Sequence, residues 1–220
     1  MPLLDARELY RFYHAGDEEV KALRGVSLAI EPGEMIALVG PSGSGKSTLL
    51  TCLAGLDEPD GGMVKVMDSA MTRRPESEKT KLRAKHLGVM RQKDNLFPHL
   101  TVLENVLLAG ALADWEDRTE AADVLDRTGM AARKSSLPAQ LSGGEQARAG
   151  LAVAMACRPR ILLLDEPTGE TDAVTEDAIL AVLSQFRKSG GAVIVATHNP
   201  AVARLATRTL AMLDGKFLDG

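Results

Sequence analysis

The residues with the clearest chemistry lie in the segment GPSGSGKST, residues 40–48. Gly40 is followed, after four residues, by Gly45, Lys46 and Ser47, which is the spacing of a phosphate-binding P-loop. Glycines in such a loop let backbone N–H groups turn towards a phosphate, because no Cβ is in the way. We expect Lys46 to reach the β- and γ-phosphates of a nucleotide and Ser47 to ligate Mg²⁺. The predicted phosphate contacts are Gly40, Ser42, Gly43, Ser44, Gly45, Lys46, Ser47 and Thr48.

Three further polar side chains each follow an apolar run. Asp165 and Glu166 end the run ILLL, and His198 ends the run AVIVAT. Ligands of open parallel sheets bind outside the carboxyl ends of the strands, so these side chains are expected to share one crevice with the P-loop. Asp165 would hold Mg²⁺, Glu166 would act as the general base on the attacking water, and His198 would contact the γ-phosphate. Without the P-loop, a solvated strand end and a structural histidine would be the better interpretations.

A second glycine pair opens a predicted helix in the segment LSGGE, residues 141–145. Ser142 and Glu145 have the spacing of a capping box, which explains both of these residues. It does not explain Gly143 and Gly144, because glycine is costly inside a helix. Paired glycines at a helix start do suit close approach to a phosphate. The Glu145 carboxylate would repel a triphosphate, so we expect it to turn back into the cap.

The elements that position these residues are predicted from hydrophobic patterns. Apolar runs at 35–40, 161–166 and 191–198 indicate buried strands in a sheet covered on both faces. The P-loop follows the first run, a context that a chance glycine-rich turn lacks. Residues 27–38 indicate two strands joined by a Pro-Gly turn, and Asp-Gly within 210–218 indicates a hairpin.

Helical patterns occupy the middle of the chain and the segment after the second buried strand. Within 176–186, the residues Ile179, Val182, Leu183 and Phe186 recur at helical spacing. Thr101 and Glu104 form a capping box ahead of an apolar run, so a helix is expected to start there. The sequence thus predicts an α/β core made of residues 1–93 and 157–220, with a helical lobe inserted at 94–156.

Composition sets limits on the partners of the chain. Of the 220 residues, 45% are hydrophobic and 25% charged, and the net charge of −4 gives no electrostatic reason to expect nucleic acid. The basic residues in 72–85 are interrupted by acids, which indicates a solvated helix face. Cys52 and Cys157 lie in apolar segments, so we expect reduced, buried thiols. Neither a signal peptide nor an apolar run of membrane-spanning length is expected.

The order of GPSGSGKST, LSGGE, ILLLDEPTGETD and ATH resembles that of the ATP-binding subunits of ABC transporters, over nearly the whole chain. The resemblance implies that Gln92 is the Q-loop glutamine, which reaches the metal and the γ-phosphate and joins the core to the lobe. It implies that Tyr13 stacks on adenine, with Tyr10 as the rival. Asp172 matches the D-loop aspartate at the dimer interface, and Ser142, Gly143 and Gly144 would close on ATP held by a second copy. The implied metal ligands are Ser47, Gln92 and Asp165.

The family further implies a P-loop NTPase core with a mostly parallel sheet, a small N-terminal antiparallel β region and the inserted lobe. The expected activity is ATP hydrolysis with Mg²⁺ by a head-to-tail dimer, bound through an integral-membrane permease to the inner face of the cell membrane and remaining otherwise cytoplasmic. The branch that handles lipoprotein release, macrolide export and haem export is the most similar. An alternative is a regulator of the cell-division type that signals through a membrane partner without transport. Nucleic-acid ATPases of this fold carry long coiled-coil or zinc-binding insertions, which this sequence lacks.

Some residues depart from the family's usual pattern. Glu145 stands where glutamine is commoner, and Arg91 precedes Gln92 where an aromatic residue is usual. GETD, at 169–172, stands where this branch often has Gly-Asn-Leu-Asp. None of these departures removes an expected catalytic group, but the branch and the cargo stay open.

Overall fold

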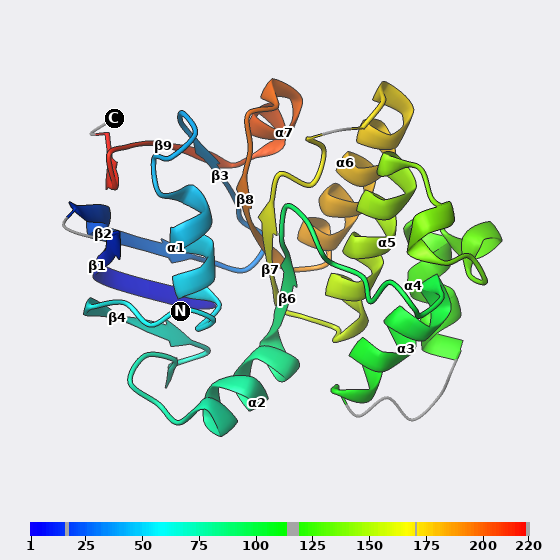
Figure 1. Cartoon of the computed structure of the whole chain (residues 1–220), viewed down its shortest axis with the longest axis horizontal. Helices are drawn as coiled ribbons and strands as arrows, with labels where there is room; N and C mark the ends of the chain where they lie inside the picture. The colour runs from blue at the N-terminus through cyan, green and yellow to red at the C-terminus, as the bar shows by residue number, and fades with distance from the viewer. Residues whose placement is uncertain (16–17, 114–118, 170, 219–220) are drawn as a thin grey trace.

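The computed structural model describes residues 1–15, 18–113, 119–169 and 171–218 (Figure 1). The described residues form two sheets, with the antiparallel one at the left of Figure 1 and the mainly parallel one at the centre. Strand order in the first is β2-β1-β4-β5, and in the second β10-β9-β3-β8-β7-β6. The strands are β1 (Leu4–Ala15), β2 (Glu18–Ile30), β3 (Met35–Val39), β4 (Gly61–Val66), β5 (Ser69–Ala70), β6 (Leu87–Met90), β7 (Ile161–Asp165), β8 (Ala192–Ala196), β9 (Arg208–Leu213) and β10 (Lys216–Phe217).

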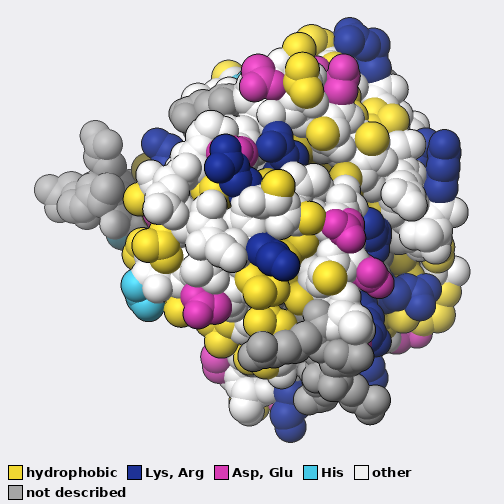
Figure 2. Space-filling view, turned by 90° about the vertical axis from the view of Figure 1, so that its right-hand side faces the viewer, with side chains coloured by type: hydrophobic (Ala, Val, Ile, Leu, Met, Phe, Trp, Pro, Cys, Tyr) yellow, Lys and Arg dark blue, Asp and Glu magenta, His cyan; other side chains and the backbone are white. Residues whose placement is uncertain are grey.

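The helices flank the central sheet, and α3 to α6 form the right-hand part of the molecule (Figure 1). Seven α-helices lie in the described ranges, with two short 3-10 helices, η1 (Ala131–Arg133) and η2 (Pro138–Gln140). The α-helices are α1 (Lys46–Leu53), α2 (Glu76–His86), α3 (Val102–Ala111), α4 (Thr119–Arg127), α5 (Gly143–Ala156), α6 (Ala173–Lys188) and α7 (Pro200–Leu205). Among the described residues, none of these helices combines the length and apolar character needed to cross a membrane. On the face that carries α3 to α6, basic and acidic side chains are interspersed among apolar ones (Figure 2).

The central sheet is buried on both faces, as its continuous apolar runs predict. Successive side chains of a strand point to opposite faces. Ile36 and Leu38 accordingly join one apolar cluster, which contains α1 and the antiparallel sheet, while Met35 and Ala37 join another, which contains α3, α5 and α6. The strands β9, β3, β8, β7 and β6 run parallel to one another. The fold is therefore the predicted α/β class, with a small N-terminal antiparallel region.

Most of the local predictions are confirmed. The hairpin at Asp214 and Gly215 joins β9 to β10, and both turn residues have a positive φ, as a two-residue hairpin of this type requires. Both capping boxes form, at Thr101 for α3 and at Ser142 for α5. The helix α2 has no buried residue, which agrees with a solvated face at 72–85.

One further local prediction is confirmed and one needs qualification. The strands within 27–38 form as predicted, and the Pro-Gly turn joins β2 to β3, which belong to different sheets. Cys52 is buried, and burial raises the pKa of its thiol to about 12. Cys157 is only half-buried, with its Sγ donating to the Ala109 carbonyl at 3.4 Å. In the described part of 91–156 the regular elements are helices, and the division of the chain into core and lobe stays a prediction.

Candidate nucleotide-binding site

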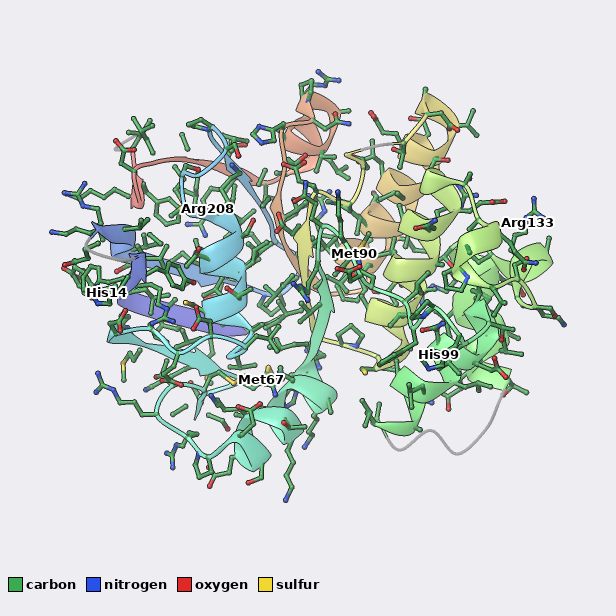
Figure 3. The ribbon with its side chains drawn as sticks, viewed as in Figure 1. His14, Met67, Met90, His99, Arg133 and Arg208 are labelled. Carbon is green, nitrogen blue, oxygen red and sulfur yellow. The ribbon has the colours of Figure 1, made fainter. Side chains whose placement is uncertain are left out.

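The carboxyl ends of three neighbouring strands bring the expected site residues together. The order β3-β8-β7 places the P-loop after β3, His198 after β8, and Asp165 and Glu166 at the end of β7, all on one edge of the sheet. A cavity of about 1370 Å³ opens along this edge. Its lining includes Tyr13, Ser42, Gly43, Gly45, Lys46, Ser47, Thr48, Gln92, Gly143, Asp165, Glu166 and His198. Met90, the last residue of β6, also lines this cavity and marks the middle of the molecule in Figure 3.

The P-loop is shaped by glycines that touch neighbouring backbone. A Cβ at Gly40 would lie 2.1 Å from the Met212 carbonyl oxygen, and a Cβ at Gly45 would lie 2.3 Å from that of Ala22. The amide of Gly215 also donates to the Ser44 carbonyl, at 3.0 Å. The loop is thus fixed by β2 on one side and by the β9–β10 hairpin on the other. Gly43 has a φ of 78° and open space around its Cβ position.

Lys46 is a buried cation with neutral partners. Its side chain is only 7% exposed, and its Nζ donates to the carbonyls of Gly40 at 2.8 Å and Pro41 at 2.9 Å. Among the described residues, no carboxylate forms an ion pair with it. The helix α1 has Gly45 as its N-cap, with neither a side-chain cap nor an acidic residue in its first turn. A buried ammonium beside an uncapped helix start fits an anion such as the phosphates of a nucleotide.

Glu166 and His198 lie in direct contact. The Glu166 Oε2 accepts the backbone N–H of His198 at 3.3 Å, and its Oε1 lies 3.4 Å from the His198 Nε2. Glu166 also adopts a φ of 49°, in the left-handed region that costs a residue with a side chain about 1–3 kcal/mol. Its backbone N–H donates to the Ala196 carbonyl, which holds this conformation. The carboxylate is therefore fixed at the end of β7 by the end of β8.

The three predicted metal ligands share a smaller cavity. Ser47, Gln92 and Asp165 all line a cavity of about 290 Å³ between α1 and the ends of β6 and β7. A hydroxyl, an amide and a carboxylate are hard oxygen donors, which suits Mg²⁺ with further ligands from water and phosphate. In the described part of the chain, no group of three or more His, Cys, Asp or Glu side chains could hold a metal. The three oxygen donors of Ser47, Gln92 and Asp165 fit Mg²⁺.

Asn95 supports the loop that carries Gln92, and no sequence pattern predicts this role. The Asn95 side chain accepts the Arg91 amide at 2.8 Å and donates to the Arg91 carbonyl at 2.6 Å. A Cβ at Gly150 would lie 3.1 Å from the Asn95 Cβ, so this asparagine packs closely on α5. Through Asn95, the loop that follows β6 touches the helix that begins at LSGGE.

Tyr13, and not Tyr10, lines the large cavity. The Tyr13 hydroxyl donates to Asp57 at 2.6 Å, and the Arg11 guanidinium lies over the tyrosine ring, 4.6 Å from its centroid. Arg11 in turn pairs with Asp57 through two donors, at 2.9 and 2.8 Å. Burial alone would raise the pKa of Asp57, but the hydrogen bonds from Tyr13 and Arg11 outweigh it and lower that pKa. Base stacking by Tyr13 stays a prediction, which this placement supports over Tyr10.

The two polar side chains of LSGGE form the capping box of α5. The Ser142 Oγ accepts the Glu145 amide at 3.2 Å, and the Glu145 carboxylate accepts the Ser142 amide at 2.9 Å, so the carboxylate turns back as expected. Gly143 lines the cavity, and Ser142 is not part of that lining. Gly144 is buried, and a Cβ there would lie 2.7 Å from the Thr175 Oγ1. Gly144 therefore has a packing reason for lacking a side chain, beside the close approach to phosphate that the sequence predicts.

Asp172 lies outside the cavity and caps α6. Its carboxylate accepts the Thr175 amide at 2.8 Å, and that backbone hydrogen bond lowers the pKa of Asp172. The side chain is exposed, and Asp172 is absent from the lining of either cavity described above. The predicted place of Asp172 at a dimer interface stays a prediction.

The P-loop after β3, the acidic end of β7 and the glycine pair that begins α5 together define an ATP-binding cassette. A family model described as "ABC transporter" matches residues 23–169. The macrolide export ATP-binding/permease protein MacB is 40% identical in Shigella flexneri and 39% identical in Escherichia coli strain K12, in each case over 99% of this chain and 34% of the relative. The chain thus spans about a third of the length of these curated relatives.

Solved structures give the same result. The dimeric structure of the ATP-binding cassette MJ0796 in a post-hydrolysis state, bound to ADP and Pi, has a TM-score of 0.93 and 34% identity, covering 98% of this chain and 97% of that one. The ATP-binding subunit of another ABC transporter has a TM-score of 0.84 at 24% identity, which supports the fold alone. The chain belongs to the ABC transporter family, in the class of ABC-type ATPases that use ATP and Mg²⁺.

Proposed function

We propose that the chain is the ATP-hydrolysing subunit of an exporter, in which two head-to-tail copies close around two ATP and drive a separate integral-membrane permease. The names of the MacB relatives join an ATP-binding part to a permease, and the likeness to this chain is limited to about a third of them. That division supports a membrane partner and a place for this chain on the inner face of the membrane. The cargo would be selected by the permease.

The observation that carries the proposal is the presence of two different phosphate-type helix starts in one chain. The first is α1, with its uncapped amides and the buried Lys46. The second is α5, where the amides of Gly143 and Gly144 donate to no oxygen of the described residues. One triphosphate needs only one such cradle in each chain, so the second is available to the nucleotide of another copy.

Within one copy, the geometry supports the following roles. Lys46 exchanges its two carbonyl partners for the β- and γ-phosphates, which are the better acceptors for a buried ammonium. Ser47, Gln92 and Asp165 hold Mg²⁺, which when bound neutralises charge on the phosphates. The Glu166 carboxylate accepts a proton from the attacking water.

The remaining roles concern the base and the link to the lobe. His198 keeps the Glu166 carboxylate in place through its backbone N–H and contacts the γ-phosphate through its ring. Tyr13 stacks on the adenine, because it stands in the cavity wall next to α1. Gln92 reports the state of the nucleotide to the lobe through its loop and Asn95. Asp172, exposed at the start of α6, faces the second copy.

A mixed dimer tests whether LSGGE acts across the dimer. Ser142→Arg blocks the start of α5, and Lys46→Ala removes the cation of the P-loop. In a linked heterodimer of the two variants, one site combines an intact Lys46 with an intact Ser142, and the other site has neither. We expect one occluded ATP per heterodimer, two in the wild type, and none in either mutant homodimer.

A matched control separates the loss of a cap from the loss of the site. Thr101→Arg removes the corresponding capping box of α3, which has no proposed contact with nucleotide. It should leave two ATP occluded per dimer. No occluded ATP in the mixed dimer, with two in the wild type, would reduce LSGGE to a helix cap and refute the proposed dimer.

A further inference from the structure

The glutamate of LSGGE has a cationic partner on a separate segment. The Arg133 Nε donates to the Glu145 Oε1 at 2.7 Å, while the other carboxylate oxygen of Glu145 accepts the Ser142 amide. Arg133 ends η1, at the right-hand side of the molecule (Figure 3). The Glu145 side chain is 17% exposed and that of Arg133 is 53% exposed. Both oxygens of the carboxylate are therefore engaged, one by the cap and one by the guanidinium.

An acid at this position conflicts with binding of an anion. Glu145 lies in the first turn of α5, whose positive dipole end would attract phosphate. The hydrogen bond from the Ser142 amide, followed by that from Arg133, lowers the pKa of Glu145, so the side chain is ionised at neutral pH. An ionised carboxylate competes with phosphate for the helix dipole and repels it. Glutamine, which is commoner in the family at this position, would provide the capping oxygen without the charge.

The ion pair is not what holds the segment of Arg133 in place. The segment is attached to α3 by backbone hydrogen bonds, because Leu103 donates to the Lys134 carbonyl and Val102 donates to the Ser136 carbonyl. These bonds do not involve the Arg133 side chain. Removal of the guanidinium should therefore change the charge beside α5 more than it changes the fold.

We propose that Arg133 is a positioning residue for the phosphate site of LSGGE: it neutralises Glu145 and holds it in the cap, so that the first turn of α5 can accept phosphate despite its acid. This inference rests on the proposed closure of LSGGE on the ATP of a second copy. On this inference, the phosphate site requires Arg133 only because residue 145 is a glutamate. Replacing Glu145 by glutamine should then remove the need for Arg133.

The test is a double-mutant cycle on ATP-driven dimerisation. All variants carry Glu166→Gln, so that ATP is bound and not consumed, and the ATP concentration for half-maximal dimer is measured by light scattering. Arg133→Ala should raise that concentration about tenfold, since each dimer contains two exposed charge pairs of modest strength. Glu145→Gln alone, and Glu145→Gln together with Arg133→Ala, should stay within about twofold of the parent. Added salt should narrow the deficit of Arg133→Ala, because it screens exposed charges.

Controls separate charge from packing. Arg133→Lys keeps a cation and should resemble the parent, and Lys134→Ala removes a neighbouring exposed cation and should have no effect. Thermal unfolding of each variant checks the fold, and Arg133→Met, which keeps the aliphatic stem, replaces Arg133→Ala if the latter is unfolded. A merely structural ion pair predicts that Glu145→Gln fails to rescue Arg133→Ala.

The outcomes distinguish this inference from the function on which it rests. If Ser142→Arg dimerises with ATP as well as the parent does, the proposed role of LSGGE is wrong. If Ser142→Arg is defective but Arg133→Ala dimerises normally, only the role of Arg133 is wrong. A double variant as weak as Arg133→Ala would likewise overturn it.

Discussion

The starts of α1 and α5 are two solutions to one problem, a helix N-terminus whose first amides need an acceptor. At α1, the N-cap is Gly45 in the left-handed conformation, and no side chain caps the helix. At α5, Ser142 and Glu145 form a complete capping box and place an acid in the first turn. The first amides of α1 are left free for an external anion, whereas at α5 the Ser142 side chain already accepts one of them, the amide of Glu145. Under the proposed function, this contrast lets α1 bind phosphate alone, while α5 contributes only when a phosphate is already held opposite it.

The largest expected effect lies at neither helix start, and it separates binding from chemistry. Glu166→Gln should lower the rate of ATP hydrolysis by about 10²–10⁴, since the amide cannot accept the proton of the attacking water. ATP affinity should be retained, because the P-loop and α1 are unchanged. The measurement is steady-state phosphate release beside nucleotide titration. Turnover at the wild-type rate would move the general base elsewhere, with His198 as the next candidate.

Lys46→Ala tests the proposed role of α1 in binding phosphate. It removes a buried cation expected to bind two phosphates, so ATP affinity of the monomer should fall by about 100-fold or more. Ser142→Ala is the matched change at α5 and should leave the affinity of the monomer unchanged. Nucleotide titration at protein concentrations below dimerisation measures both. Equal losses of ATP affinity in the two variants would show that both helix starts bind the same nucleotide within one chain.

Gly144→Ala tests the packing at the start of α5. The added Cβ would lie 2.7 Å from the Thr175 Oγ1, so we expect the free energy of unfolding to fall by about 1–3 kcal/mol. Thr175→Ala removes that oxygen and the neighbouring methyl group, so the cost of Gly144→Ala should be smaller in the Thr175→Ala background. Denaturant unfolding of the four proteins measures this coupling. Additive losses would mean that the cost of Gly144→Ala does not come from the contact with Thr175.

Local chemistry was the part of the site that the sequence could predict. A P-loop, a capping box and an apolar run that ends in an acid each lie within about ten neighbouring residues. The sequence therefore predicts them directly, in GPSGSGKST, LSGGE and ILLLDE. The expectation that Asp165 and His198 share a crevice with the P-loop followed from a general property of parallel sheets, whereas the order of the strands was not predicted.

Contacts between distant segments could not be predicted in this way. Gly144 meets Thr175 and Glu145 meets Arg133 only because the start of α5 packs against α6 and lies beside η1. The choice between Tyr10 and Tyr13 depends on β1, whose pairing with β2 shifts register between Leu9 and Tyr10 and again between Arg11 and Phe12. Each shift breaks the simple alternation of side chains, so their faces cannot be assigned by counting.

The attachment of the P-loop to the β9–β10 hairpin has a consequence for the order of folding. The Ser44 carbonyl accepts from Gly215, and Gly40 packs against the Met212 carbonyl, although about 170 residues of chain separate the two segments. During synthesis, these contacts cannot form until the hairpin has left the ribosome. Most of the parallel sheet, α5 and α6 are complete before that moment. The loop that holds the nucleotide is therefore among the last parts of the described chain to gain its native support, and a truncated product lacks it.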